Sequence, residues 1–363
     1  MPYLQRFRDW YRAHERHAQA AAFALGFIID SLTLTRVDVL YSNLIFTSYL
    51  FLAALGIIAR YAYGTGRFVS AASGRVIPWV ELAIPFSFGN LLSGYIVSYT
   101  KSASLVTSWP FLVALAFLFI GNELFKKRYQ LLIFQLSVLF ITIFSYLLFF
   151  IPVLLRRIGS DMFLLSGAAS LVLFTGIVFL LRLIDSRPLQ QIQRSLVISV
   201  GTIFLLFNVA YFANIIPPLP LSLKAIGVYH SVLAGEKNSY FLQYEPAPWY
   251  RPFEMTDRTI HIESGAPAYV YSAIFAPAKL STTIIHRWSY YDETEKTWKI
   301  ANTVSFPIIG GRDNGYRGYS FKGNITPGKW RVDVLTLRGQ SVGRINFSVV
   351  SGTPLSLVSY IVE

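Results

Sequence analysis

One carboxylate stands inside an apolar stretch that is long enough to cross a membrane. Asp30 interrupts the stretch 18–34, and Ala18, Ala22 and Gly26 precede it at a spacing of four, on the same helix face. A charged side chain within a bilayer is costly unless it is paired or reaches water, so Asp30 is a candidate functional residue. The small residues on its face would let a neighbouring helix approach closely.

A second polar stripe offers a partner for Asp30. Asn90, Gly94 and Ser98 recur at a spacing of four and lead down to Lys101. Both stripes end on the same expected side of the membrane, so we expect Asp30 and Lys101 to pair near the outer leaflet. The complete predicted intramembrane polar cluster is Asp30, Arg36, Asp38, Asn90, Ser98, Lys101, Arg156 and Arg157.

Two interpretations of this cluster stay open. It could be an outward-facing site for the phosphate of a lipid-linked envelope substrate, because guanidinium groups are good donors to phosphate. The simpler interpretation is a helix-packing ion pair together with ordinary loop charges.

Aromatic residues form the second candidate site. The part of the chain beyond 220 holds more tyrosine and tryptophan than one small domain can easily bury, so some rings should stay on the surface. Flat exposed rings stack on sugars or enter protein interfaces. The possible aromatic binding surface comprises Trp249, Tyr250, Tyr290, Tyr291, Tyr316 and Tyr319.

Other catalytic chemistry finds little support in the sequence. The chain has no cysteine, which excludes thiol nucleophiles, disulfides and cysteine-ligated metals. His230, His261 and His286 are too scattered to predict a metal site. His286 and Trp288 share one strand face, which favours a structural histidine beside a core tryptophan. We therefore predict no metal, no cofactor and no recognisable catalytic motif.

Long uncharged runs account for the composition of the first 219 residues. The whole chain is 54% hydrophobic and only 14% charged, and a run of about 20 apolar residues can cross a bilayer. A polytopic α-helical membrane bundle of about seven spans is predicted. Its expected spans are 18–34, 39–59, 82–100, 102–122, 129–155, 162–181 and 195–219, after an amphipathic interfacial helix over 1–17.

Basic residues predict the orientation of this bundle. With the N-terminus in the cytoplasm, 13 of the 17 lysine and arginine residues in 1–219 lie on the inner side. Seven spans then place the remainder of the chain in the periplasm of a bacterial inner-membrane protein. This placement also explains the net charge of +13 without nucleic-acid binding.

Short alternating segments replace the long apolar runs in the last third of the chain. Seven candidate strands, separated by turn residues, predict a C-terminal all-β immunoglobulin-like sandwich over 255–363. Residues 220–254 are rich in proline and aromatic residues and are expected to be a connector. The strands are expected at 258–262, 267–275, 282–291, 297–306, 316–322, 329–337 and 343–350.

Several short motifs resemble a known family. His286-Arg287-Trp288, the segment 315–320, the segment 327–333 and Gly339-Gln340 resemble the domain of unknown function DUF2914. The stretches 26–30, 36–38 and 121–124 resemble the helices that precede this domain in bacterial membrane proteins. The resemblance implies the same architecture and carries no activity.

These observations predict a non-enzymatic role. We expect the sandwich to bind an envelope glycan or a protein partner, with the bundle anchoring it among membrane lipids. The alternative is a membrane enzyme or transporter that acts on a lipid-linked substrate through Asp30 and Lys101.

Overall fold

The computed structural model describes residues 40–66, 71–102, 109–117, 131–218, 220–236, 239–251, 254–277, 280–311, 315–354 and 356–362. The chain forms two compact units. The helical unit comprises Met1–Tyr99, Leu112–Phe150 and Leu164–Asn208, and the β unit comprises Thr100–Phe111, Ile151–Phe163 and Val209–Glu363. The predicted helix 1–17 and the predicted span 18–34 lie outside the described residues.

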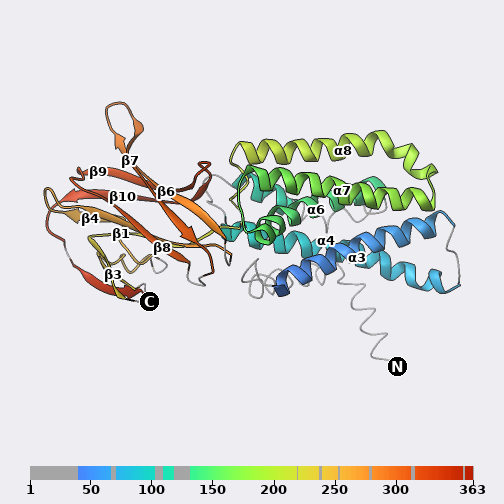
Figure 1. Ribbon diagram of the computed structural model, residues 1–363, viewed down its shortest axis with the longest axis horizontal. Coiled ribbons are helices and arrows are strands. Elements are labelled where there is room, and N and C mark those ends of the chain that lie inside the picture. Colours follow the sequence, from blue (N-terminus) through green and yellow to red (C-terminus); the bar gives the residue numbers. More distant parts are fainter. Residues whose placement is uncertain are drawn as a thin grey trace, which may run out of the picture. The chain divides into compact units, whose positions relative to one another are not determined.

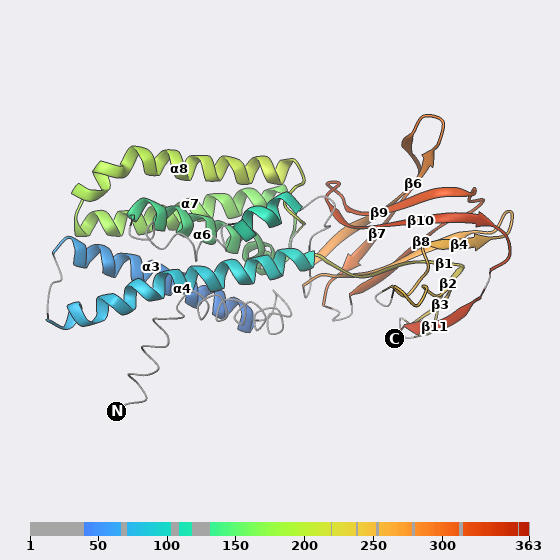
Figure 2. The ribbon, with the colours of Figure 1, turned by 180° about the vertical axis from the view of Figure 1, so that it is seen from behind.

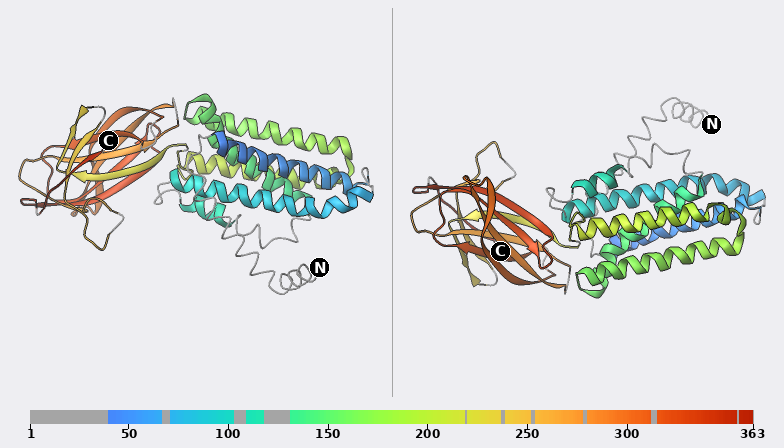
Figure 3. Two further views of the ribbon diagram at one scale, coloured as in Figure 1. Left: turned by 90° about the horizontal axis from the view of Figure 1, so that it is seen from below. Right: turned by 90° about the horizontal axis from the view of Figure 1, so that it is seen from above.

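Among the described residues, five helices are long and apolar enough to cross a membrane. They run side by side in Figures 1 and 2, and Figure 3 shows the same common direction from two further sides. These helices coincide with the predicted segments 39–59, 82–100, 129–155, 162–181 and 195–219. The segment 102–122 is described only at 102 and over 109–117, which is helical. The helices are α3 (Leu40–Gly64), α4 (Ala71–Ser102), α6 (Leu132–Leu155), α7 (Ser160–Ile184) and α8 (Arg187–Phe212).

The limits of α8 differ from the predicted span 195–219. The helix begins at Arg187, whose backbone N–H donates to Asp185 Oδ1 at 3.0 Å. It therefore starts eight residues before the uncharged run on which the prediction was based. It ends at Phe212, because Asn214 adopts a φ of 58° and Pro217 and Pro218 follow.

Aromatic rings and a few hydroxyl groups hold the helical unit together. The rings of Phe46, Tyr95 and Phe149 meet at centroid distances of 5.5–5.7 Å. The Tyr95 hydroxyl donates to Thr142 O at 2.9 Å, and the Ser166 hydroxyl donates to Leu147 O at 2.9 Å. Such bonds satisfy polar groups that lipid cannot hydrate.

Three sheets build the β unit. The strand order is β1-β5-β8 in one sheet, β4-β10-β9-β6-β7 in the second and β11-β3-β2 in the third. All seven predicted strands are present, as β4 to β10. The strands are β1 (Ser222–Tyr229), β2 (Ser231–Ala234), β3 (Tyr240–Tyr244), β4 (Thr259–Ile262), β5 (Ala268–Phe275), β6 (Ser281–Asp292), β7 (Thr297–Ile309), β8 (Tyr316–Lys322), β9 (Gly328–Thr336), β10 (Ser341–Ser351) and β11 (Val358–Val362).

Residues 220–254, expected to be a connector, contain three of these strands. In β1 the segment Ala225–Tyr229 pairs with Tyr269–Ala273 of β5, so this segment is part of a sheet. The prolines at 217, 218 and 220 stand just before β1 and leave its backbone N–H groups free for pairing.

The first two sheets share one apolar core, to which Val228 and Val270 contribute from one sheet and Trp288 and Val332 from the other. A hydrogen-bonded network crosses this core. His286 Nε2 lies 2.9 Å from Ser272 Oγ, and His286 Nδ1 lies 2.9 Å from Ser320 Oγ. Trp288 Nε1 donates to the same Ser320 oxygen at 2.9 Å. Since β6 belongs to one sheet and β5 and β8 to the other, this network joins the two sheets.

Burial keeps His286 neutral. The side chain is fully buried, and this burial lowers the pKa of the imidazole from 6.5 to about 4. A neutral imidazole has one N–H donor and one acceptor, which suits its position between two hydroxyl groups. His286 is therefore a structural residue beside a core tryptophan, as its spacing from Trp288 predicts.

The lowered pKa of His286 predicts a stability change in acid. The unfolded chain binds a proton below pH 6.5 and the folded chain only below about 4, so stability is full above 6.5 and falls as the pH drops towards 4. The loss attributable to this group is about 3 kcal/mol. Thermal unfolding of the full chain, followed by tryptophan fluorescence, should show a smaller loss over this window in His286→Gln than in the wild type. Identical pH dependence in both proteins would contradict the assignment.

Candidate functional site

The predicted intramembrane polar cluster is only partly described by the structure. Asp30, Arg36 and Asp38 lie outside the described residues, and so does the side chain of Lys101, at the end of α4. The Asn90 amide donates to Phe86 O at 2.8 Å within α4, and Ser98 is buried. Neither observation indicates a ligand.

The two arginines of that cluster that were expected in an outer loop lie just after α6. Arg156 adopts a φ of 56° and is exposed. Arg157 pairs with Asp161 at 3.3 Å, both with largely exposed side chains. This pair is an ordinary loop ion pair, which agrees with the simpler interpretation for these two residues.

The six predicted aromatic residues do not form one surface. Trp249 and Tyr250 are 90% and 61% exposed, with ring centroids 6.0 Å apart. Tyr290 contacts Trp330 and packs against the core between the sheets, and Tyr316 also packs against buried apolar residues. Tyr319 lies among other tyrosines, and the centre of its ring is 6.1 Å from that of Tyr240.

Tyr291 belongs to a different group, on the face of the five-stranded sheet that points away from the core. Its ring lies 5.3 Å from that of Trp298 on β7. The Arg331 guanidinium lies 4.6 Å from the centre of the Trp298 ring. These contacts lead to a set of charged residues that was not predicted as a site.

Three arginines surround one carboxylate on this face. In the strand register, Asp333 of β9 lies between Arg287 of β6 and Arg344 of β10. Arg344 Nε pairs with Asp333 Oδ1, and Arg331 Nε lies 3.2 Å from Asp333 Oδ2. Because side chains alternate along a strand, Arg331 and Asp333 share one face of β9. We call Arg287, Ser289, Arg331, Asp333 and Arg344 the arginine face.

The charges of the arginine face do not balance. Three guanidinium groups against one carboxylate leave an excess of two positive charges. Burial, and then the charges of Arg344 and Arg287, lower the pKa of Arg331 against the opposing effect of Asp333. The side chain of Asp333 is 5% exposed and that of Arg331 is 20% exposed, so the group is only partly screened by water.

A buried hydroxyl group completes the arginine face. Ser289 lies opposite Arg331 in the β6–β9 register and is 1% exposed. Its Oγ atom has no hydrogen-bond partner among the described residues. The three guanidinium groups above it form a set of donors suited to a carboxylate, sulfate or phosphate group.

The three acidic residues at the neighbouring hairpin are, by contrast, each paired with a lysine. Lys299 lies 2.6 Å from Asp292 and 2.7 Å from Glu295, and Lys329 lies 2.9 Å from Glu293. These residues lie at or beside the β6–β7 hairpin, which projects from the sheets in Figures 1 and 2. The excess positive charge is therefore concentrated on the arginine face.

The scattered histidines do meet in part. His230 Nε2 and His261 Nδ1 donate to the two oxygens of Glu245 at 2.9 and 2.7 Å. Burial raises the pKa of Glu245, but hydrogen bonds from His261 and His230 outweigh it and lower the pKa overall. Within the described part of the chain, no group of three His, Cys, Asp or Glu side chains could hold a metal ion.

The sequence contains only a weak signal for the arginine face. Arg331 and Asp333 alternate with apolar residues, and Arg287 and Arg344 occupy outward positions of other predicted strands. Only the pairing of β6, β9 and β10 brings them together.

Removing the carboxylate tests the balance of charge on this face. Asp333→Asn leaves three partly buried guanidinium groups without a counter-charge and should destabilise the β unit by about 1–3 kcal/mol. Added sulfate should restore part of the loss in this variant and change the wild type little, as measured by thermal unfolding. An unchanged midpoint, or equal sulfate effects on both proteins, would show that the arginines do not depend on Asp333.

Comparison with known proteins finds an informative similarity for one segment of the chain. No curated protein matches the chain. Among solved structures, the alkylpurine DNA glycosylase AlkC of Pseudomonas fluorescens, bound to DNA containing an abasic site analog, aligns with 8% identity and a TM-score of 0.23, over 87% of this chain and 99% of that one. A similarity this low carries no argument about fold or function.

Residues 281–349 match the model of a protein family described as "Protein of unknown function (DUF2914)". The match runs from the start of β6 into β10. It includes His286 and Trp288 of the core network and every residue of the arginine face. This segment is therefore similar to DUF2914, and the arginine face lies within the matched residues.

Proposed function

We propose that this chain is a bacterial inner-membrane protein whose periplasmic, immunoglobulin-like β domain binds an acidic envelope glycan without catalysing a reaction. The observation that carries this proposal is the arginine face, with its excess of two positive charges beside the paired rings of Trp298 and Tyr291.

Charge and shape both favour an acidic sugar as the ligand. Guanidinium groups form paired hydrogen bonds to carboxylate and phosphate groups, which sugar acids and phosphorylated glycans carry. Aromatic rings beside such groups can stack on the apolar face of a sugar ring. A neutral glycan could only stack on the aromatic rings. The arginine face therefore supplies the specificity for acidic over neutral glycans.

The arginine face lacks the groups that acid–base chemistry would need. Asp333 is its only carboxylate, and two arginines already engage that carboxylate. An acid–base pair needs a second titratable group within reach of the reacting atoms, and no other described residue of this face supplies one. Binding is therefore the better proposal.

The arrangement of basic residues supports the periplasmic location. Arg60, Arg182, Arg187 and Arg194 lie near the end of α3, the end of α7 and the start of α8. These ends come together, because the Tyr61 hydroxyl donates to Asp185 O in the α7–α8 turn. The positive-inside rule places this side in the cytoplasm, and α8 then leads to the β domain on the other side.

Binding of a short uronic-acid oligosaccharide to the purified full chain tests the proposal. Arg344→Gln should weaken this binding about tenfold, because a charge-assisted hydrogen bond is lost. Arg258→Gln is the matched control, since it removes the same charge from a residue that pairs with Glu254 outside the arginine face. Trp298→Ala should weaken the binding of acidic and neutral sugars equally.

A neutral glucose oligosaccharide of the same length is the reference ligand. Equal affinity for the acidic and neutral sugars, or equal effects of Arg344→Gln and Arg258→Gln, would contradict the proposal. Binding of an acidic peptide but of no sugar would identify a protein partner instead.

Asp30 supports a second candidate function. A carboxylate in an otherwise apolar stretch favours a membrane enzyme or transporter for a lipid-linked substrate, with Lys101 as its partner. This candidate predicts that Asp30→Ala and Lys101→Ala fold and reach the membrane but fail to complement a deletion strain. Normal complementation by both variants would eliminate it.

A further inference from the structure

The helices α7 and α8 pack closely along one part of their length and leave a cleft between them along another. A Cβ atom on Gly167 would lie 3.1 Å from the Phe204 ring, so the helices are closely packed at that level. Towards their joining turn, a cleft of about 400 Å³ opens between them. Phe174, Leu189 and Leu196 are buried and form its floor.

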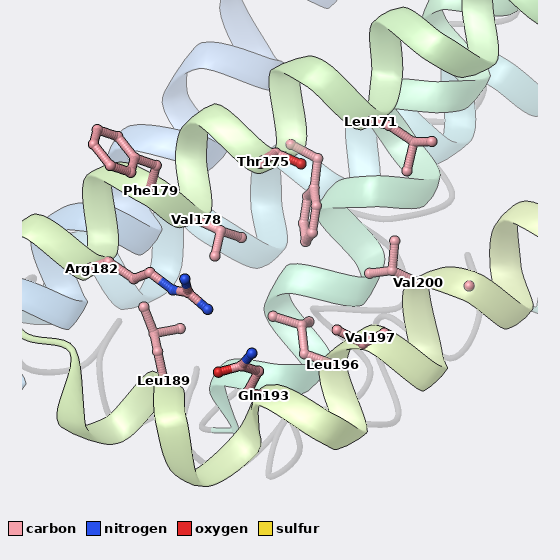
Figure 4. Close-up of a pocket in the computed structure, with 12 residues that line it drawn as sticks. Leu171, Thr175, Val178, Phe179, Arg182, Leu189, Gln193, Leu196, Val197 and Val200 are labelled. Carbon is pink, nitrogen blue, oxygen red and sulfur yellow. The ribbon is translucent and has the colours of Figure 1, made fainter.

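The cleft is apolar along its length and polar at one end. Leu171, Val178, Val197 and Val200 contribute apolar walls. Arg182 and Gln193 stand at the end nearest the α7–α8 turn, and both side chains point into the space between the helices (Figure 4). The lining of the cleft therefore matches a lipid molecule, which has a polar head and an apolar tail.

The length of the cleft fits one leaflet of a bilayer. Leu171 and Arg182 lie at its two ends on α7, eleven residues apart, which corresponds to about 16 Å of helix. Half of the hydrocarbon core is about 15 Å thick. An acyl chain in the cleft would therefore reach from the surface of the leaflet to the middle of the bilayer.

The charge at the polar end is positive. Asp185 pairs with Arg187 at 2.9 Å, and Glu81 pairs with Arg60 at 3.2 Å. Arg182 has no acidic partner among the described residues, and its side chain is exposed. A guanidinium and an amide at the mouth of an apolar cleft are complementary to a phosphate group that carries net negative charge.

From these observations we infer that the α7–α8 cleft is a binding site for an anionic phospholipid, with one acyl chain in the cleft and its phosphate at Arg182 and Gln193. This site is separate from the arginine face, so it does not depend on the proposed glycan binding. A lipid held there would fill the space between α7 and α8, and α8 is the helix that leads to the β domain.

Native mass spectrometry of the full chain tests this inference. The purified protein is mixed with equal amounts of phosphatidylglycerol and phosphatidylcholine that carry the same acyl chains. The wild type should retain phosphatidylglycerol preferentially. Arg182→Gln should reduce phosphatidylglycerol occupancy about tenfold without changing phosphatidylcholine occupancy. Arg182→Lys should keep part of the preference, which shows that the effect follows charge and not misfolding.

Two matched controls separate the cleft from its surroundings. Arg194→Gln removes a neighbouring exposed charge that does not line the cleft, and it should leave the preference unchanged. Gly201→Leu places a side chain in the cleft and should reduce the occupancy of both lipids. Gly176→Leu makes the same change at a position outside the cleft, where a Cβ atom also meets nothing within 4 Å, and should have no effect.

Three results would overturn the inference. One is equal retention of the two lipids by the wild type, and another is equal loss in Arg182→Gln and Arg194→Gln. The third is a dimer that Gly201→Leu dissociates while lipid occupancy stays constant, because a helix of a second copy would then occupy the cleft.

Discussion

The carboxylate of Asp333, placed between the guanidinium groups of three arginines, is the interaction on which the functional account depends. Without it, three like charges on adjacent strands would repel one another in a partly dehydrated environment. With it, the face is stable but still carries an excess of two positive charges. An external anion would stabilise the same arrangement further, so the charge balance that allows this face to exist also specifies what it can bind.

The core network and the arginine face are linked through β6. His286 and Trp288 point into the core, where they hydrogen-bond to serines of the other sheet. Arg287 and Ser289 alternate with them and point outward. A slip of one residue in the pairing of β6 would expose the imidazole and bury the guanidinium, so the network also fixes the arginine positions.

Periodicity explains what could be predicted from the sequence. Uncharged runs predict the five long apolar helices, and alternating apolar residues predict β4 to β10, because both patterns depend directly on which side chains avoid water. Strand pairing leaves no such pattern, so the sequence alone does not predict that Arg287, Asp333 and Arg344 lie together. The prolines before β1 favoured a connector, although the residues after them pair with β5. The number of aromatic residues does not show which rings are exposed: of the six predicted, Tyr290 and Tyr316 pack against the core, and Trp249 and Tyr250 are the strongly exposed ones.

Anomalous diffraction from crystals of the full chain soaked in selenate shows whether the arginine face binds an anion. Selenate is a tetrahedral dianion, and its anomalous signal locates it without assumptions about the ligand. A selenate ion is expected in contact with Arg331 and Arg344, and it should be lost from crystals of Arg344→Gln. Selenate bound elsewhere on the β domain, with the arginine face unoccupied, would contradict it.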